Sequence, residues 1–538
     1  MRVLLINSNL KDDILAAPPI GLCYVASAAE TAGHEVKVLD LCFKRRLQPE
    51  LEKAITGFSP QVIGVSLRNL DNVNMLRPVS YLPSALKIVQ EIRALTAAPL
   101  VLGGSGASLD PQGVLEFLQG DYIVVSEGEK SFVDLLDALN RGESPAQIPG
   151  VGMCRQGKFQ VTPPQLTSFP PGNPRLAKWV DLTPYEKMGG SYTIQTKRGC
   201  RMRCIYCTYN QVLEGNHLRL RSPSEVVDEI EEAFYQFNPE AFEFVDSVFN
   251  DPVDHCREIL EEIIRRPWKT RFTTMGVSPK NLDSQFLQLM QRAGFTSFMI
   301  SPESASKTML TNYQKGFDLE DLRRAARAIN QVSFPVLWYF LIGGPGETTR
   351  TLQETLKFIE QYLVRKEGPS YNLVNIFLGV RIYPGTKLWE IALEEGLIHD
   401  RCNPLRPLWY LSRELDLDET MRQLFQAACR MPEIALGDIE KYLPLSKIFG
   451  AVRKVFPFPK PYWQHLISVH QILVKLGVRS LFQARGVPAQ LREYLNLQSN
   501  RPSSAPVTDN ETLSRHQARK ARSSLASPIS SLPHRKSP

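Results

Sequence analysis

Short β-branched runs alternate with amphipathic segments over residues 1–140. The runs that predict strands are residues 2–6, 35–39, 62–67, 99–102 and 122–125. The segments with helical spacing of apolar residues are 20–32, 49–57, 83–96, 111–118 and 129–140. This alternation favours the α/β class, with a doubly wound parallel sheet that binds its ligand beyond the carboxyl ends of the strands. Residues 1–140 are therefore predicted to form a Rossmann-like domain.

A second alternation covers residues 191–395. Its predicted strands are 192–197, 241–246, 270–275, 297–301, 335–342 and 373–380. Its predicted helices are 223–237, 252–265, 283–293, 318–331, 348–364 and 386–395. Six such units are typical of a partial (β/α)6 TIM barrel or of an open twisted sheet. In both folds the functional residues gather at the carboxyl ends of the strands.

The remaining segments differ in composition from these two units. Residues 141–190 are rich in Pro and Gly and are predicted to be a linker. Residues 396–496 have a mostly helical pattern and are expected to form a C-terminal domain. Residues 497–538 are rich in Ser, Pro and Arg and poor in large apolar residues, which predicts a disordered basic tail.

The net charge of +7 is concentrated in that tail. Residues 498–538 hold seven Lys and Arg against two Asp and Glu, which leaves only about +2 for the rest of the chain. We therefore expect no nucleic-acid partner. The sequence has no apolar run long enough to cross a membrane, and its first residues lack a signal-peptide pattern, so we expect a cytoplasmic protein. In the cytoplasm its cysteines are expected to be reduced. We also expect a monomer.

Three of the nine cysteines lie together in the segment GCRMRCIYCTY, as Cys200, Cys204 and Cys207. They follow the first strand of the second unit. A structural zinc ion would need a fourth ligand, yet His217 lies ten residues beyond Cys207 and no second C-x-x-C is present. Three thiolates leave one position open, which favours a [4Fe-4S] cluster that binds a further molecule at one iron. A zinc site and plain buried thiols are the alternatives.

The C-x-x-x-C-x-x-C spacing, with Tyr206 before the last cysteine, resembles the radical S-adenosylmethionine (SAM) superfamily. The resemblance implies that the open iron binds SAM and that one electron cleaves it to a 5′-deoxyadenosyl radical. It also implies an external one-electron reductant such as flavodoxin or ferredoxin. The expected SAM contacts, all near strand ends, are Tyr206, Asp246, Ser247, Glu303, Gly343, Gly344, Arg381 and Tyr383.

Simpler roles compete for some of these residues. Ser247 could cap a helix, and the turn Gly343 to Glu347 could be a capped helix start. The stretch with His217, Arg219 and Arg221 could clamp the cysteine loop or a carboxylate, or could be plain surface charge. No residue is assigned a catalytic role from the sequence.

The first unit, placed ahead of such a barrel, resembles the cobalamin-binding domain of B12-dependent radical SAM proteins. The quoted segments are PPIGLCYVASAAETAGHEVKVLD, VLGGSGAS and VVSEGEKSFVDLL. The expected cobalamin contacts are Gly21, Ser66, Arg68, Asn69, Gly103, Gly104, Ser105, Ser126, Glu127, Gly128 and Glu129. The histidine motif D-x-H-x-x-G is missing and His34 is interpreted as a turn residue. Cobalt is therefore expected to lack a histidine ligand, and Arg68 or Asn69 would occupy the face of cobalt where the histidine would bind. The missing donor, or a cation in its place, would favour cob(I)alamin over methylated cobalt(III).

These resemblances predict an enzyme, a cobalamin-dependent radical SAM methyltransferase. Methyl would pass from methylcobalamin to a carbon of a small-molecule substrate, either after hydrogen abstraction or by direct nucleophilic attack, as in the tryptophan 2-C-methyltransferases. Oxidative cyclisation or rearrangement with the same cofactors is the alternative. A non-catalytic sensor of cobalamin or iron is a minor one.

Overall fold

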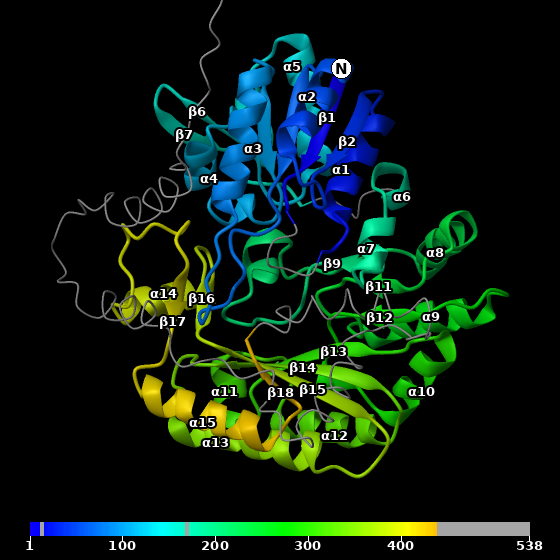
Figure 1. Ribbon diagram of the computed structural model, residues 1–538, viewed down its shortest axis with the longest axis vertical. Coiled ribbons are helices and arrows are strands. Elements are labelled where there is room, and N and C mark those ends of the chain that lie inside the picture. The colour runs from blue at the N-terminus through cyan, green and yellow to red at the C-terminus, as the bar shows by residue number, and fades with distance from the viewer. Residues whose placement is uncertain (11–15, 167–171, 438–538) are drawn as a thin grey trace, which may run out of the picture. The chain divides into compact units, whose positions relative to one another are not determined.

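The computed structural model describes residues 1–10, 16–166 and 172–437, and Figure 1 shows their course. The first domain is built on a seven-stranded sheet in the order β2-β1-β3-β4-β5-β6-β7. Its strands are β1 (Arg2–Asn7), β2 (Glu35–Asp40), β3 (Val62–Ser66), β4 (Leu100–Gly103), β5 (Tyr122–Val124), β6 (Val151–Arg155) and β7 (Lys158–Val161). The five predicted strands are confirmed and are all parallel. Because the strand order reverses between β1 and β3, a ligand crevice is expected at their carboxyl ends.

Helices cover both faces of this sheet, as predicted for a doubly wound fold. They are α1 (Ile20–Thr31), α2 (Leu47–Phe58), α3 (Leu82–Leu95), α4 (Pro111–Leu118) and α5 (Gly128–Arg141), with a short turn η1 (Ala107–Leu109). Alternate residues of β1 serve the two faces. Val3 and Leu5 pack with α1 and α5, whereas Leu4 and Ile6 pack with α2 and α3.

Part of the predicted linker belongs to this sheet. Residues 151–161 form the antiparallel hairpin β6-β7, which extends β5 through the pairing of Tyr122 with Met153. A short turn η2 (Pro145–Gln147) precedes it. The Pro and Gly content of 141–190 indicates turns, but Val151 is only 2% exposed because its strand pairs with β5 and packs on the core of the first domain. The pattern alone did not indicate that an edge was available for pairing.

The later part of that segment packs on the first domain through two short helices, α6 (Leu176–Trp179) and α7 (Thr183–Lys187). The Tyr185 hydroxyl donates to Asp40 Oδ2 at 2.8 Å, and the Trp179 indole donates to Ser27 Oγ at 2.9 Å. Residues 172–190 are therefore tied to α1 and β2 and do not run as a loose connection.

The second unit is a curved set of parallel strands. Their bounds are β8 (Tyr192–Ile194), β11 (Phe242–Phe244), β12 (Phe272–Thr274), β13 (Phe298–Glu303), β14 (Pro335–Ile342), β15 (Tyr371–Leu378) and β18 (Ile434–Leu436). Strands β8, β11 and β12 form one sheet and β13, β14, β15 and β18 another. Single bridges, such as Val277 with Ile300, connect the two sheets. The six predicted strands are confirmed, and β18 is a seventh.

Helices α8 (Pro223–Phe237), α9 (Val253–Arg265), α10 (Ser284–Ala293), α11 (Lys307–Asn312), α12 (Leu319–Asn330), α13 (Thr349–Phe358), η5 (Ile359–Val364) and α14 (Lys387–Glu394) follow the strands. Figure 1 shows α12, α13 and α15 along one face of β13-β14-β15-β18. Trp338 of β14 and Ile376 of β15 belong to the core on that face, whereas Leu337 and Leu373 lie in a separate apolar layer on the other face.

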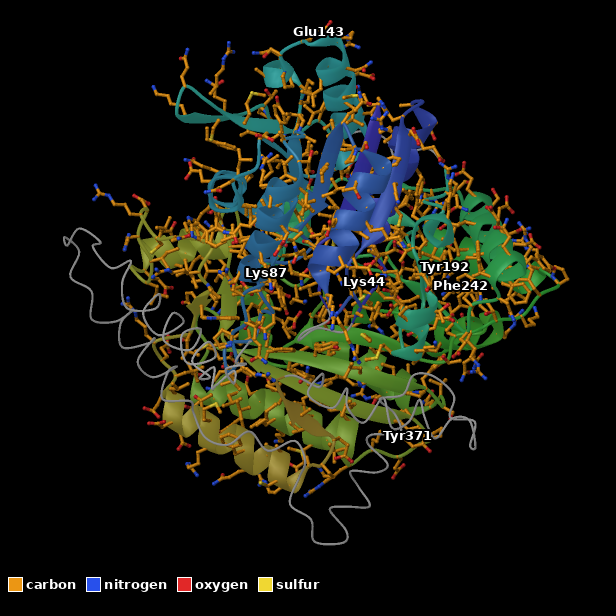
Figure 2. The ribbon with its side chains drawn as sticks, turned by 45° about the horizontal axis from the view of Figure 1, so that its top comes forward. Lys44, Lys87, Glu143, Tyr192, Phe242 and Tyr371 are labelled. Atoms are coloured by element: carbon orange, nitrogen blue, oxygen red, sulfur yellow. The ribbon has the colours of Figure 1, made fainter. Side chains whose placement is uncertain are left out.

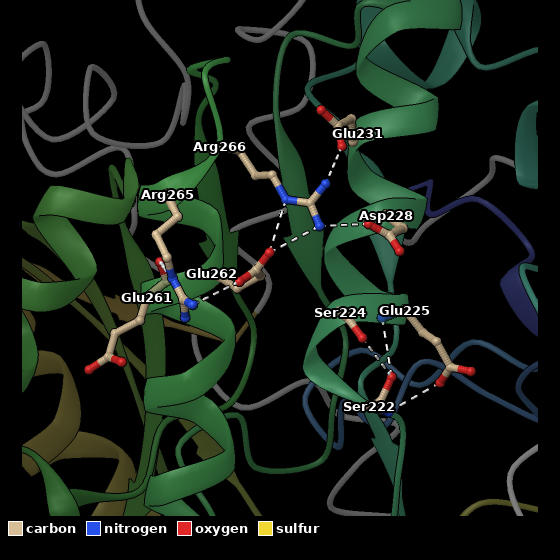
Figure 3. A network of polar contacts seen from close by, with 9 residues as sticks. All are labelled: Ser222, Ser224, Glu225, Asp228, Glu231, Glu261, Glu262, Arg265 and Arg266. Atoms are coloured by element: carbon tan, nitrogen blue, oxygen red, sulfur yellow. Dashed lines mark hydrogen bonds and ion pairs between the residues drawn. The ribbon is translucent and has the colours of Figure 1, made fainter.

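Local contacts fix the start of this unit. Tyr192 of β8 and Phe242 of β11 are paired in register, with ring centroids 5.4 Å apart (Figure 2). Ser222 and Glu225 form a capping box at the start of α8. Arg266, just after α9, pairs with Asp228 and Glu231 of α8 and with Glu262 (Figure 3). The ion pairs of Arg266 connect the end of α9 to α8.

Between residues 396 and 437 the structure is less helical than the sequence predicts. Strand β16 (Val380–Ile382) pairs with β17 (Leu408–Tyr410), and α15 (Leu417–Arg430) leads into β18, parallel to β15. Of the predicted C-terminal domain, 438–496 lies outside the described residues, as does the predicted tail 497–538. No helix among the described residues is long and apolar enough to cross a membrane.

Candidate active site

The cysteine loop lies between β9 (Lys197–Arg198) and a helical turn, η3 (Tyr209–Leu213). Cys200 and Cys204 are buried and Cys207 is half-buried. Gly199 adopts a φ of 83°, and a Cβ there would lie 2.1 Å from the carbonyl oxygen of His217. Only glycine allows the chain to pass this point. β9 and β10 (Arg219–Leu220) form a small antiparallel ladder that holds both ends of the loop.

Burial of the cysteine loop favours the protonated form of its thiols. Burial raises the pKa of Cys200 to about 11, so its proton must be displaced by a metal centre for it to act as a ligand. Burial also raises the pKa of Cys207, but the backbone N–H groups of Asn210 and Tyr209 lower it. In the described part of the chain no three His, Cys, Asp or Glu side chains surround a point where a single ion would sit. A cluster takes one thiolate per iron, so its ligands need not converge.

Tyr206 connects the loop to the end of β13. Its hydroxyl donates to Glu303 Oε1 at 2.8 Å, and Lys315 Nζ lies 3.1 Å from the same hydroxyl. Glu303 is 9% exposed and has a left-handed backbone, with φ of 65°. Two of the expected SAM contacts, Tyr206 and Glu303, are thus in direct contact. Lys315 was not found from the sequence.

Asp246 lies just beyond β11 and is buried, and its carboxylate is fully engaged within the barrel. It accepts from Thr196 Oγ1 at 2.7 Å, from Thr196 N at 2.8 Å and from Lys197 N at 3.2 Å. These bonds fix the segment between β8 and β9, just ahead of the cysteines. Ser247 is exposed, and its carbonyl oxygen lies 2.7 Å from where a Cβ of Gly276 would be.

The turn after β14 is organised by Glu347. Its Oε2 accepts from Gly343 N at 2.7 Å, and burial raises its pKa to about 7 although the N–H groups of Gly343 and Gly344 lower it. Gly343 has φ of 110°, and a Cβ on Gly344 would lie 2.4 Å from the Tyr313 ring. The two glycines therefore let the turn approach Tyr313, which packs against Tyr206 with ring centroids 5.6 Å apart.

Arg381 of β16 pairs with the first domain. Its Nε donates to Asp71 Oδ2 at 2.9 Å, and its side chain is 3% exposed. Tyr383 lies under the guanidinium, 4.4 Å from Arg381 Cζ to the ring centroid. Asp71 belongs to the long loop after β3, which reaches β16 (Figure 1). Both residues expected near SAM are thus engaged at the contact between the two domains.

The loops at the carboxyl edge of the first sheet pack closely together. A Cβ on Gly104 would lie 2.5 Å from Leu67 O, and Ser105 Oγ donates to Arg68 O at 2.7 Å. Ser66 O accepts from Ser8 Oγ at 2.7 Å. Among the described residues the half-buried Arg68 guanidinium has no hydrogen bond or ion pair, and Gly21 has open space around its Cα. This glycine-lined edge with one uncommitted cation fits a large, flat, polar ligand such as cobalamin.

The loop after β5 touches the cysteine-loop region. Ser126 donates to Leu213 O, Glu127 pairs with Arg219 at 2.5 Å, and Glu129 with Arg198 at 2.5 Å. Gly128 begins α5 between the two acids. Arg219 is therefore a buried clamp and not a plain surface charge, and Arg221 likewise pairs with Glu229 at 2.6 Å.

Several residues of this site gave no signal in the sequence. Asp71, Arg198, Glu214 and Lys315 stand alone in loops or short ladders, without a motif. Glu214 accepts from Gly199 N at 2.9 Å, which supports the strained glycine ahead of Cys200. His34, in contrast, lies where predicted, in the turn before β2, beside the N-terminal amine and Asp137.

Comparison with known families agrees with both halves of the site. Residues 194–359 match the model of the radical SAM superfamily, and residues 15–136 match that of the B12 binding domain. The first match contains the cysteine loop and the ends of β11, β13 and β14. The second contains the glycine-lined edge.

Three known proteins are similar over most of the chain. An uncharacterized methyltransferase, PH0819, of Pyrococcus horikoshii is 24% identical, covering 78% of this chain and 90% of its own. The tryptophan 2-C-methyltransferase of Streptomyces laurentii is 28% identical, covering 73% and 74%. The structure of the radical SAM methyltransferase TsrM from Kitasatospora setae, with cobalamin and a [4Fe-4S] cluster bound, superposes with a TM-score of 0.76 at 23% identity, covering 88% and 98%. With both domain models matched and this fold shared, the chain combines a B12-binding domain with a radical SAM domain.

Proposed function

We propose that this protein is a methyltransferase that uses cobalamin, SAM and a [4Fe-4S] cluster to methylate a carbon of a small molecule. The observation that carries the proposal is the direct contact between the two half-sites. The loop Ser126 to Glu129, at the cobalamin edge, is bonded to Leu213, Arg198 and Arg219 around the cysteine loop. This contact joins the residues that would hold cobalamin to those that would hold the cluster.

The residues that would hold the cluster are Cys200, Cys204 and Cys207. When bound, the cluster supplies one-electron chemistry on SAM, and cobalamin supplies a methyl carrier. Tyr206 and Glu303 would orient SAM from the cysteine loop and from β13, and Ser247, Gly343 and Gly344 lie on the neighbouring strand ends. Asp246 would act one step away, by fixing Thr196 and Lys197 ahead of the cysteines.

On the cobalamin side, the glycine turn after β4 and the segment Ser66 to Asn69 would contact the cofactor. Arg68 is the cation available to face cobalt, since the described chain gives its guanidinium no partner and no histidine follows β1. An external one-electron donor, such as a flavodoxin or ferredoxin, completes the proposal. None of the nine cysteines, all within the described residues, is in a disulfide, as the reducing cytoplasm would keep them.

The test is anaerobic reconstitution with iron, sulfide and cobalamin, followed by incubation with SAM, reductant and extract metabolites. Mass spectrometry should find a product heavier by one methyl group, together with S-adenosylhomocysteine. The matched control is Cys204→Ala, which should abolish SAM consumption while cobalamin still binds. If 5′-deoxyadenosine accumulates with no methylated product, oxidative cyclisation or rearrangement is the better function. If SAM is never consumed, the protein is not an enzyme of this kind.

A further inference from the structure

Lys315 is a buried cation beside the cysteine loop. It follows α11, and its side chain is 8% exposed. Its ammonium group lies 3.0 Å from Ser301 O, 3.1 Å from Tyr206 Oη and 3.4 Å from Glu303 Oε1. Three acceptors match the three N–H bonds of an ammonium group, so no proton is left for a substrate. Lys315 is therefore built into the site as a fixed charge.

The segment around Lys315 is attached to the cysteine loop at several points. Ile205 N donates to Tyr313 O at 3.2 Å, and a Cβ on Gly316 would lie 2.0 Å from Met202 Sδ. The Lys315 ammonium also lies 5.8 Å from the centroid of the Tyr206 ring, within cation–π range. A movement of residues 313–316 would therefore displace residues between the cysteines.

Glu303 shows the effect of this arrangement on the chain. The register of β13 against β14 shifts between Ile300 and Glu303, and Glu303 then takes a left-handed φ of 65°. That conformation is strained for a residue other than glycine. The bonds from Tyr206 and Lys315 to its carboxylate hold it there.

The charge of Lys315 lies beside Tyr206, which stands between Cys204 and Cys207 in the cysteine loop. Burial by itself lowers the pKa of this ammonium group, but the neighbouring Cys204 and Glu303 raise it above its ordinary value. Lys315 therefore stays protonated at neutral pH. In a site that excludes water, a fixed positive charge interacts strongly with any change of charge nearby.

We propose that Lys315 is a positioning residue that raises the reduction potential of the bound cluster by placing one positive charge beside its thiolate ligands, with Glu303 as the partial counter-charge. This inference rests on the proposed function, because it needs a cluster on the three cysteines. Reduction transfers one electron from an external donor to the cluster and makes it more negative by one unit. A nearby cation stabilises that state, and a nearby anion destabilises it.

The test is a potentiometric titration of the reconstituted protein, followed by electron paramagnetic resonance, without SAM. Iron and sulfide are measured first. Lys315→Met should shift the midpoint potential to more negative values. Lys315→Arg keeps the positive charge, so its midpoint potential should stay close to that of the wild type. Glu303→Gln removes the counter-charge and should shift the midpoint in the opposite direction, to less negative values.

The outcomes separate the inference from the function on which it rests. A midpoint unchanged in Lys315→Met, or shifted in the same direction by Lys315→Met and Glu303→Gln, overturns the inference. If Lys315→Met does not fold, Glu303→Gln decides alone, because any result other than a less negative midpoint overturns it. A wild-type protein that takes up no cluster refutes the proposed function itself, independently of Lys315.

Discussion

Beside the cysteine loop, two carboxylates of the first domain share two arginines of the barrel, whereas at β16 a single carboxylate has a single arginine. In the first contact Arg198 pairs with Glu129 at 2.5 Å and with Glu127 at 3.6 Å, and Arg219 also pairs with Glu127. In the second, Asp71 pairs with Arg381. All six side chains are buried or nearly so. Both contacts therefore bury charged side chains in an interface. In the network the charges are shared among four side chains, whereas in the pair each charge has one partner.

The two contacts differ in the charge that is left unpaired when one of their ionised side chains is removed. Removing one partner of a buried ion pair leaves an uncompensated charge, and this costs more than the pair contributes when it is intact. Arg381 cannot turn toward solvent, because it also donates to the carbonyl oxygens of Ile382 and Pro404. In the network, Arg198 and Arg219 both keep Glu127 when Glu129 is neutralised. Because its charges are shared, the contact near the cysteines is expected to lose less stability than the contact at β16 when one carboxylate is neutralised.

The largest expected effect comes from the isolated pair. Asp71→Asn should lower the free energy of unfolding by about 3–5 kcal/mol, because Arg381 is left buried without a counter-charge. Chemical denaturation measures this. The double variant with Arg381→Met should recover part of the loss. As a control, Lys130→Gln at the exposed pair Lys130–Asp134 should change stability by less than about 1 kcal/mol.

A smaller effect is expected in the network. Glu129→Gln should cost roughly 1.5–3 kcal/mol, the range for a hydrogen bond to a charged group, because Arg198 keeps Glu127 and the Tyr24 ring. The same substitution should weaken cobalamin binding in a visible absorbance titration, since the loop Ser126 to Glu129 lies at the proposed cobalamin edge. A loss of stability as large as that of Asp71→Asn would show that sharing gives no protection.

The smallest effect concerns pH. The network continues through Tyr24 to the pair Arg221–Glu229. Burial raises the pKa of Glu229 from its ordinary 4.5 to about 7, although Arg221 lowers it. The folded state thus holds this proton more tightly than the unfolded state, so stability falls as pH rises from 4.5 to 7. One proton limits the slope to about 1.4 kcal/mol per pH unit.

Glu229→Gln should flatten that dependence, as measured by denaturation at several pH values. The matched variant is Glu225→Gln at the exposed start of the same helix, which should leave the slope as in the wild type. An identical slope for wild type and Glu229→Gln would show that Glu229 is ionised throughout this range.

The sequence alone determined the two strand-helix alternations, because hydrophobic periodicity is a local property of the chain. It also determined the loop of three cysteines and the glycine turn after β4, since both depend on residues close together in sequence. The hairpin β6-β7 and strand β18 were missed, because short strands join a sheet only where an edge is available. Their own patterns carry little information.

The tertiary structure alone decided the partners of the charged residues. Asp71 and Arg381 are 310 residues apart, and Lys315 reaches Tyr206 across 109 residues. Nothing in the local pattern tells a buried charge from a surface charge. Only the packing of the first domain on the barrel ends, and of α11 on the cysteine loop, removes water from these side chains and makes their pairing obligatory.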